Sequence, residues 1–184
     1  MKDIPHRLMQ SPGNYRIAIL SAFALGLHGV ESILPTPFPW LRLGLANIIT
    51  LITLLLYGMR AAVMVTLIRV ILGSLFAGTF LGPAFVLSIS GGLASTAAMG
   101  FTLSMAPGIF STVGLSIIGA FFHNAIQLFL AYFLFIQNME ALLFIAPLII
   151  LIGTLTGTVN GIVSDTLLSN LKKYAQKSQN VSEA

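Results

Sequence analysis

Arg69 is the residue of this sequence whose position most strongly indicates a binding role. It lies nine residues beyond Arg60, inside a long apolar stretch, which corresponds to about 13 Å along a helix. An arginine at that depth in a membrane costs about 2.5 to 3.5 kcal/mol on insertion scales. Glu31 and Arg42 stand near the same inferred depth. These residues either form an internal Glu–Arg pair with one snorkelling arginine, or leave a guanidinium available for an anionic ligand.

A second polar group lies in the apolar stretch that begins at Ser111. Gln127 follows His123 by four residues and Asn124 by three, so the three side chains share one side of a helix. They either line a cavity or make structural hydrogen bonds to neighbouring helices, and Asn47 allows the same two interpretations. The candidate ligand-binding residues are therefore Glu31, Arg42, Asn47, Arg69, His123, Asn124 and Gln127.

The residue combinations that enzymes use for catalysis are largely absent. Asp3 and Asp165 are the only aspartates, whereas an all-helical prenyltransferase needs clustered aspartates to hold Mg²⁺ against a diphosphate. No carboxylates are spaced for acid–base catalysis, and no nucleophile, histidine-pair or nucleotide-binding motif is present. The chain has no cysteine, which excludes thiolate metal sites. We therefore predict that the chain is not an enzyme and holds no metal or cofactor.

The composition indicates the solvent in which these polar residues lie. Hydrophobic residues make up 57% of the 184 residues and charged residues 8%, and the mean hydropathy is +0.96. Charged residues make up roughly a quarter of a soluble domain. A soluble enzyme and a disordered chain are therefore both excluded. The nine Lys and Arg residues give a net charge of +4 but form no basic patch, so nucleic acid is not an expected partner. A multi-pass protein of the lipid bilayer remains.

Apolar stretches close to the length of about 20 residues that a membrane helix requires occur six times. The sequence therefore predicts an all-α integral membrane protein with six transmembrane helices. Its transmembrane domain covers residues 15–169, between an N-terminal segment at 1–14 and a polar tail at 170–184. The predicted spans, of which the second is short, are Tyr15–Leu34, Leu43–Tyr57, Ala61–Phe80, Ala84–Met105, Ser111–Ile136 and Ala141–Leu168.

The positions of Lys and Arg predict the orientation of these spans. If there are six, the basic residues before the first span, after the last span and in the connection after the second all fall on one side. The positive-inside rule then places both termini in the cytoplasm. The residues on that side are Lys2, Arg7, Arg16, Arg60, Lys172, Lys173 and Lys177.

Small residues recur every four positions along the first and last spans. Such rows let helix backbones approach closely and commonly mark contact faces between helices. In the last span we expect helix packing inside the bundle, and in the first a partner subunit competes with internal packing. The two rows are Ala18, Ala22 and Gly26, and Gly153, Gly157 and Gly161.

Four ordered motifs resemble a known family. They are LRLGLANIITL at 41–51, RVILGSLFAGTF at 69–80, SISGGLAS at 88–95 and IGAFFHNAIQL at 118–128. Together they resemble the bacterial membrane proteins known as heptaprenyl diphosphate synthase component I, also called the Gx transporter family. The resemblance covers residues 16–168. The architecture is also similar to that of the S components of energy-coupling factor (ECF) transporters, which have six helices and cytoplasmic termini.

The resemblance to S components implies a function. It implies a substrate-binding subunit of the bacterial inner membrane for uptake of a small, anionic or amphipathic molecule. A coupling subunit docked on Ala18 and Ala22, together with an ATPase pair, would supply the energy. The ligand would lie near the outer face, below a lid at residues 35–40.

Two other interpretations remain open. The family name implies a non-catalytic membrane component of a heptaprenyl diphosphate synthase or of a quinone-linked electron-transfer system, with a soluble prenyl synthase subunit as partner. A self-contained secondary transporter would need a broken helix, for which Gly91-Gly92 is the candidate.

Overall fold

The computed structural model describes residues 13–33 and 44–182 of the chain. In these two ranges the chain is helical, without strands. The elements are α1 (Asn14–Ile33), α2 (Ala46–Tyr57), α3 (Met59–Phe76), α4 (Pro83–Met105), α5 (Thr112–Ala131), the π-helix η1 (Tyr132–Ile136) and α6 (Met139–Ser182).

The helices begin and end at local signals that the sequence already contains. Gly58 has a φ of 81° and separates α2 from α3, a conformation that glycine adopts without a steric penalty. Pro83 occupies the start of α4. Proline lacks the backbone N–H, but an N–H at this position would have no acceptor within the helix. The Ser111 hydroxyl accepts a hydrogen bond from the Gly114 N–H at 3.1 Å and caps α5. The turns therefore fall where the sequence predicts them.

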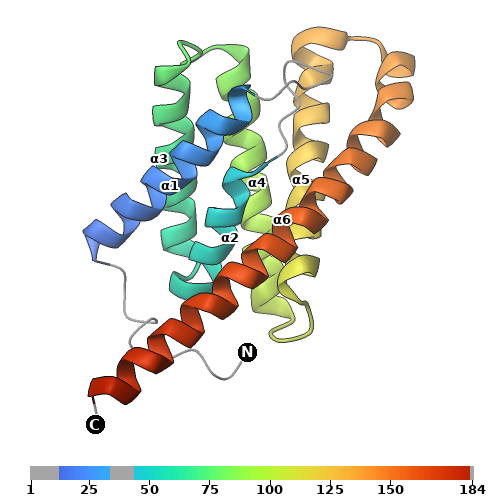
Figure 1. Ribbon diagram of the computed structural model, residues 1–184. Helices are drawn as coiled ribbons and strands as arrows, with labels where there is room; N and C mark the ends of the chain where they lie inside the picture. Colours follow the sequence, from blue (N-terminus) through green and yellow to red (C-terminus); the bar gives the residue numbers. More distant parts are fainter. Residues whose placement is uncertain (1–12, 34–43, 183–184) are drawn as a thin grey trace.

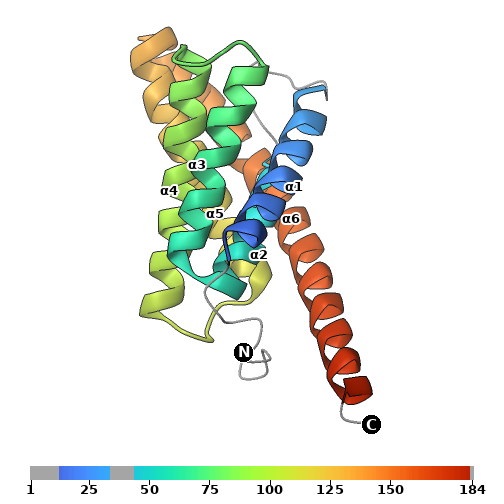
Figure 2. The ribbon, with the colours of Figure 1, turned by 90° about the vertical axis from the view of Figure 1, so that its left-hand side faces the viewer.

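The helices form a bundle with α2 at its centre (Figures 1 and 2). α3, α4 and α5 run side by side, α1 crosses α3, and the long α6 runs obliquely across the bundle from the α5 side. α2 contacts all five other α-helices, and most of its side chains are buried. α1, α3 and α5 begin, and α2, α4 and α6 end, toward the lower end of Figure 1.

Four of the described helical segments are long and apolar enough to cross a membrane: α3, α4, α5 continued by η1, and α6 as far as Tyr174. α2 has 12 residues, which is about 18 Å against a hydrocarbon core of about 30 Å. α1 contains Arg16, His28 and Glu31 and is not among the four. An all-helical protein with helices long enough to span a membrane is confirmed. The predicted count of six spans also includes α1 and α2, which are not among these four helices.

Apolar side chains cover the outside of the bundle, whereas many of its buried side chains are polar. Phe76, Phe101 and Phe144 are strongly exposed. Inside, hydroxyl groups link three helices: the Oγ1 atoms of Thr50 in α2 and Thr66 in α3 are 3.3 Å apart, and those of Thr66 and Thr96 in α4 are 3.1 Å apart. Hydrocarbon offers no hydrogen bonds, so polar groups in such a bundle must be satisfied by the protein itself.

The last helix is longer than the sequence predicts. We expected the final span to end near Leu168, but α6 continues to Ser182. The sequence after Leu168 contains no Gly or Pro and consists largely of Lys, Ser, Ala, Gln and Asn, several of which favour helix. The polar segment from residue 170 is therefore helical as far as Ser182, because nothing in it ends the helix.

The glycine row of α6 lies against α5. A Cβ at Gly161 would lie 2.6 Å from the Val113 Cα and 3.0 Å from the Ser116 Cβ, and one at Gly157 would lie 2.8 Å from the Ala120 Cβ. Two of these distances are shorter than real Cβ contacts, and all three end on Cα or Cβ atoms that are fixed to the backbone of α5. The close contact between the two helices therefore requires glycine at these positions.

Replacing Gly161 with alanine is expected to destabilise the protein. The added methyl group forces α6 away from α5, which costs about 1–3 kcal/mol and lowers the thermal unfolding midpoint in detergent. Gly26→Ala is the matched control, because a Cβ at Gly26 meets nothing within 4 Å and alanine favours helix by about 1 kcal/mol. Equal midpoints for the two variants would contradict the assigned contact.

Candidate ligand-binding site

Polar side chains from five helices meet in the upper half of the bundle as drawn in Figure 1. Glu31 from α1, Asn47 from α2, Arg69 from α3 and His123 from α5 line one cavity, together with His28, Gly44 and Ser88. Four of the seven candidate binding residues, far apart in sequence, therefore share one cavity. Arg42 lies outside the described residues, as does the proposed lid at 35–40.

A second cavity adjoins the first on the side of α6. Gly44, Asn47 and His123 line both cavities, and Asn124 and Asn160 line the second. A fifth candidate, Asn124, thereby joins the cluster. Gln127 lines neither cavity but lies beside His123, because both side chains pack within about 3.1 Å of a Cβ built on Gly91.

The Arg69 side chain is buried between helices. It is 4% exposed, and its Nη2 donates a hydrogen bond to the Asn47 Oδ1 at 2.8 Å. A Cβ at Gly92 would lie 3.5 Å from the same Nη2, so the glycine allows the guanidinium to lie close to α4. Asn47 thus holds the arginine by one nitrogen and fixes where its positive charge lies.

The backbone of Gly44 connects three helices at the edge of the cluster. The Gly44 N–H donates to the Glu31 Oε1, and its carbonyl accepts from the Asn160 Nδ2 at 3.1 Å. Its φ of 75° lies in the left-handed region that glycine adopts readily. Glu31 of α1 and Asn160 of α6 are therefore joined through one residue, three positions before Asn47.

Close contacts with glycine also position the polar residues of α5. A Cβ at Gly153 would lie 1.8 Å from the Asn124 Nδ2, and one at Gly91 would lie 3.0 Å from the His123 Cε1. α4 is continuous through Gly91 and Gly92. The candidate break that a secondary transporter would need is therefore absent at these two glycines, and Gly91 serves instead as a contact point for His123.

Several buried polar atoms of the cluster have no hydrogen-bond partner among the described residues. They are the Asn124 Oδ1, the Gln127 Nε2 and the Ser95 Oγ, and all three side chains are at most 4% exposed. Buried polar atoms are normally paired with protein or with ordered water. An acceptor, a donor and a hydroxyl are thus available within the bundle for a polar molecule.

Both cavities are narrow. Each offers about 10 Å³ of space, which is room for about one water molecule. Pockets for small organic ligands measure about 300–1,000 Å³. The described residues thus form a closed polar cluster, and a larger ligand could enter only if helices or side chains moved apart. Among these residues, no group of three or more His, Asp or Glu side chains could hold a metal ion.

The small residues of α1 lie on the side of that helix that faces away from His28 and Glu31. Ala18, Ala22 and Gly26 are exposed. A shallow apolar groove of about 420 Å³ includes Ala22 and Gly26, bordered by Ile19, Phe23 and Leu27. The two small-residue rows therefore differ: Gly157 and Gly161 of α6 are buried against α5, while the row of α1 faces outward.

Nine of the residues that line the two cavities were not among the candidate binding residues. They include His28, Gly44, Ser88 and Asn160, none of which stands out when taken alone in the sequence. Gly44 carried a usable signal, because it stands three residues before Asn47 within the motif at 41–51.

Residues 20–167 match the sequence model of the family described as heptaprenyl diphosphate synthase component I. The chain belongs to this family. The bundle also matches a solved structure described as the S component of a bacterial ECF transporter, with a TM-score of 0.68 and 22% sequence identity over 88% of this chain and 95% of that chain. Both resemblances inferred from the motifs are confirmed. A search of the curated proteins finds no match.

Charge neutralisation at Arg69 and Glu31 is expected to be non-additive. Arg69→Gln and Glu31→Gln each leave one buried charge without its opposite charge in the same cavity, which is strongly destabilising in an apolar interior. The loss of stability in the double variant should be smaller than the summed losses of the two single variants by about 0.5–3 kcal/mol. Thermal unfolding in detergent measures these losses. Arg60→Gln, at an exposed position, is the control. Additive losses would show that the two charges do not interact.

Proposed function

We propose that this member of the family is the substrate-binding membrane subunit of an uptake transporter. The observation that carries this proposal is the buried cluster of Glu31, Asn47, Arg69, His123 and Asn124 inside a bundle with the fold of an S component. One cationic group, one carboxylate and several neutral hydrogen-bonding groups suit a ligand that they bind without reaction. Catalytic carboxylate clusters are missing from the whole sequence.

The proposed topology has six spans, with both termini in the cytoplasm. Arg16, Arg60, Lys172 and Lys173 lie near the starts of α1 and α3 and in the last part of α6, toward the lower end of Figure 1. The positive-inside rule makes this end cytoplasmic. The polar cluster then lies in the outer half of the bundle, where it would be reached from outside the cell.

The chemistry of the cluster favours an anionic or amphipathic ligand. The Arg69 guanidinium can pair with a carboxylate or phosphate, and the free acceptor and donor of Asn124 and Gln127 suit a neutral polar group. The surrounding helices supply apolar walls. Arg42 and the proposed lid at 35–40 complete this hypothesis but lie outside the described residues.

Energy for uptake would come from partner subunits, since the sequence contains no nucleotide-binding motif. The outward-facing small residues of α1 are the proposed docking face for a membrane-embedded coupling subunit, which would itself bind an ATPase pair. Small residues let helix backbones approach closely within a membrane. The apolar groove beside Ala22 and Gly26 suits a partner helix.

The family description favours one alternative function. In that case the chain is the non-catalytic membrane component of a heptaprenyl diphosphate synthase or of a quinone-linked electron-transfer system. Its polar cluster would then serve assembly or bind an isoprenoid-related molecule for a soluble synthase subunit.

Native mass spectrometry of the protein released from its own membranes tests ligand binding. We expect one bound small molecule. The Arg69→Gln and Asn124→Ala variants should no longer retain it, because each substitution removes a group of the cluster. Arg60→Gln should retain it. A protein that carries no small molecule but co-purifies with a soluble synthase, and raises its activity, would establish the alternative.

Bulky residues on the exposed face of α1 test the docking proposal. Ala18→Trp and Ala22→Trp should prevent co-purification of a coupling subunit and abolish uptake, while the bound ligand is retained. Ala97→Trp is the matched control, because Ala97 is also an exposed alanine, on α4. The docking assignment is wrong if the α1 variants co-purify the same partners as the Ala97 variant.

A further inference from the structure

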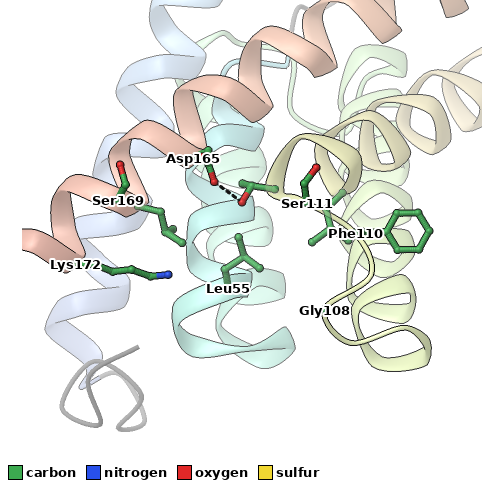
Figure 3. A pocket seen from close by; sticks show the side chains of 10 residues that line it. Leu55, Gly108, Phe110, Ser111, Asp165, Ser169 and Lys172 are labelled. Carbon is green, nitrogen blue, oxygen red and sulfur yellow. Dashed lines mark hydrogen bonds between the residues drawn. The ribbon is translucent and has the colours of Figure 1, made fainter. Parts of the chain in front are cut away.

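A second site lies at the opposite end of the bundle from the polar cluster. It is a cavity of about 310 Å³ between the end of α2, the start of α5 and the last part of α6. Leu55, Thr112 and Asp165 line it, together with Ser169 and Lys172 (Figure 3). None of these residues lines either cavity of the ligand cluster, so the two sites are separate.

The cavity presents opposite charges that do not pair with each other. Asp165, Ser169 and Lys172 follow one another at spacings of four and three residues, so they share one face of α6. The seven residues between Asp165 and Lys172 correspond to roughly 10 Å along the helix. Within the described part of the chain the Asp165 carboxylate accepts a hydrogen bond from the Thr112 hydroxyl at 2.8 Å, and the Lys172 ammonium makes no hydrogen bond or ion pair.

The groups around Asp165 can accept hydrogen bonds but have few protons left to donate. The Thr112 hydroxyl donates its proton to Asp165, and the Ser169 hydroxyl donates its proton to the Thr166 carbonyl at 2.8 Å. The oxygens of both hydroxyls retain lone pairs, as does the second carboxylate oxygen. Such a set of acceptors suits a primary ammonium group, which has three N–H donors and no acceptor.

Part of the cavity lining is apolar. Leu115 of α5 and Leu168 of α6 are buried and line the cavity together with Leu55 of α2. The cavity also lies where α6 reaches the end of its apolar segment, which extends to Tyr174. A molecule that fills it would therefore be charged at one end and apolar at the other, and would lie at the level where helices leave the membrane.

We propose that this cavity binds the headgroup of a phospholipid with a primary ammonium, of the phosphatidylethanolamine type. Lys172 pairs with the phosphate. The oxygens of Asp165, Thr112 and Ser169 accept hydrogen bonds from the ammonium group, and the leucines contact the start of an acyl chain. An anionic phospholipid of the phosphatidylglycerol type carries the same phosphate but has no ammonium to neutralise the Asp165 carboxylate. A choline headgroup has no N–H to donate to the carboxylate.

The experiment compares lipids that differ only in the headgroup. The purified full chain is incubated with phosphatidylethanolamine, phosphatidylcholine or phosphatidylglycerol of identical acyl chains, and bound lipid is measured by native mass spectrometry. Hydrogen bonds to a charged group predict a preference for phosphatidylethanolamine of roughly tenfold or more. Equal binding of the three lipids, or a preference for phosphatidylglycerol, overturns the proposal.

Variants assign the preference to the cavity. Asp165→Asn and the milder Thr112→Val should reduce the preference for ethanolamine over choline, and Lys172→Gln should weaken binding of both lipids because both carry the phosphate. Lys173→Gln is the matched control, since Lys173 is exposed and does not line the cavity. Equal effects of the two lysine variants overturn the assignment of the phosphate to Lys172.

A soluble headgroup distinguishes a lipid from a free amine. Glycerophosphoethanolamine carries the same charges without acyl chains, so it should compete poorly with the intact lipid. If it binds as tightly as the lipid, the apolar wall contributes nothing and the cavity is a site for a soluble amine instead.

Discussion

The guanidinium of Arg69 lies almost fully buried in a bundle whose outer surface is apolar, and the surrounding structure is arranged to accommodate it. Asn47 accepts its hydrogen bond at 2.8 Å, and Glu31 brings a negative charge to the same cavity. Asn47 lies in the first turn of α2, which is short and central, and there it meets the arginine of α3.

Glycines determine how closely the helices can surround this charge. Gly91 allows His123 to lie against α4, and Gly153 allows Asn124 to lie against α6. A Cβ at either position would crowd a polar residue of the cluster, whereas a Cβ at Gly92 would lie closest to the Thr66 Cγ2, at 3.0 Å. The row in α6 continues through Gly157 and Gly161, where the contact with α5 is purely one of packing. Helix packing and the polar cluster therefore depend on the same feature, the close approach of α4 and α6 to α5.

Much of the fold could be predicted from the sequence, because apolar length and turn residues are local properties. Five of the seven candidate binding residues line the two cavities and Gln127 lies beside them, since depth along a helix also follows from sequence spacing. His28 and Asn160 could not be identified in this way. Their roles depend on which helices are neighbours, as when Asn160 of α6 reaches the Gly44 carbonyl at 3.1 Å. The sequence predicts the end of a membrane span near Leu168, whereas α6 continues to Ser182, because polarity ends a membrane span but does not by itself end a helix.

The closed state of the cluster has a consequence for how a ligand would enter. The Gly44 N–H already donates to the carboxylate of Glu31, and Arg69 already donates to Asn47. A carboxylate or phosphate of a ligand could take over the first bond and pair with the guanidinium, so that one buried anion replaces another. Such an exchange avoids the large cost of an unpaired charge in hydrocarbon if the displaced Glu31 carboxylate reaches water or takes up a proton. Movement of Glu31 away from Gly44 would also release the link between α1 and α6 that runs through Gly44. Entry of an anionic ligand and separation of these two helices would therefore be coupled through the backbone of one glycine.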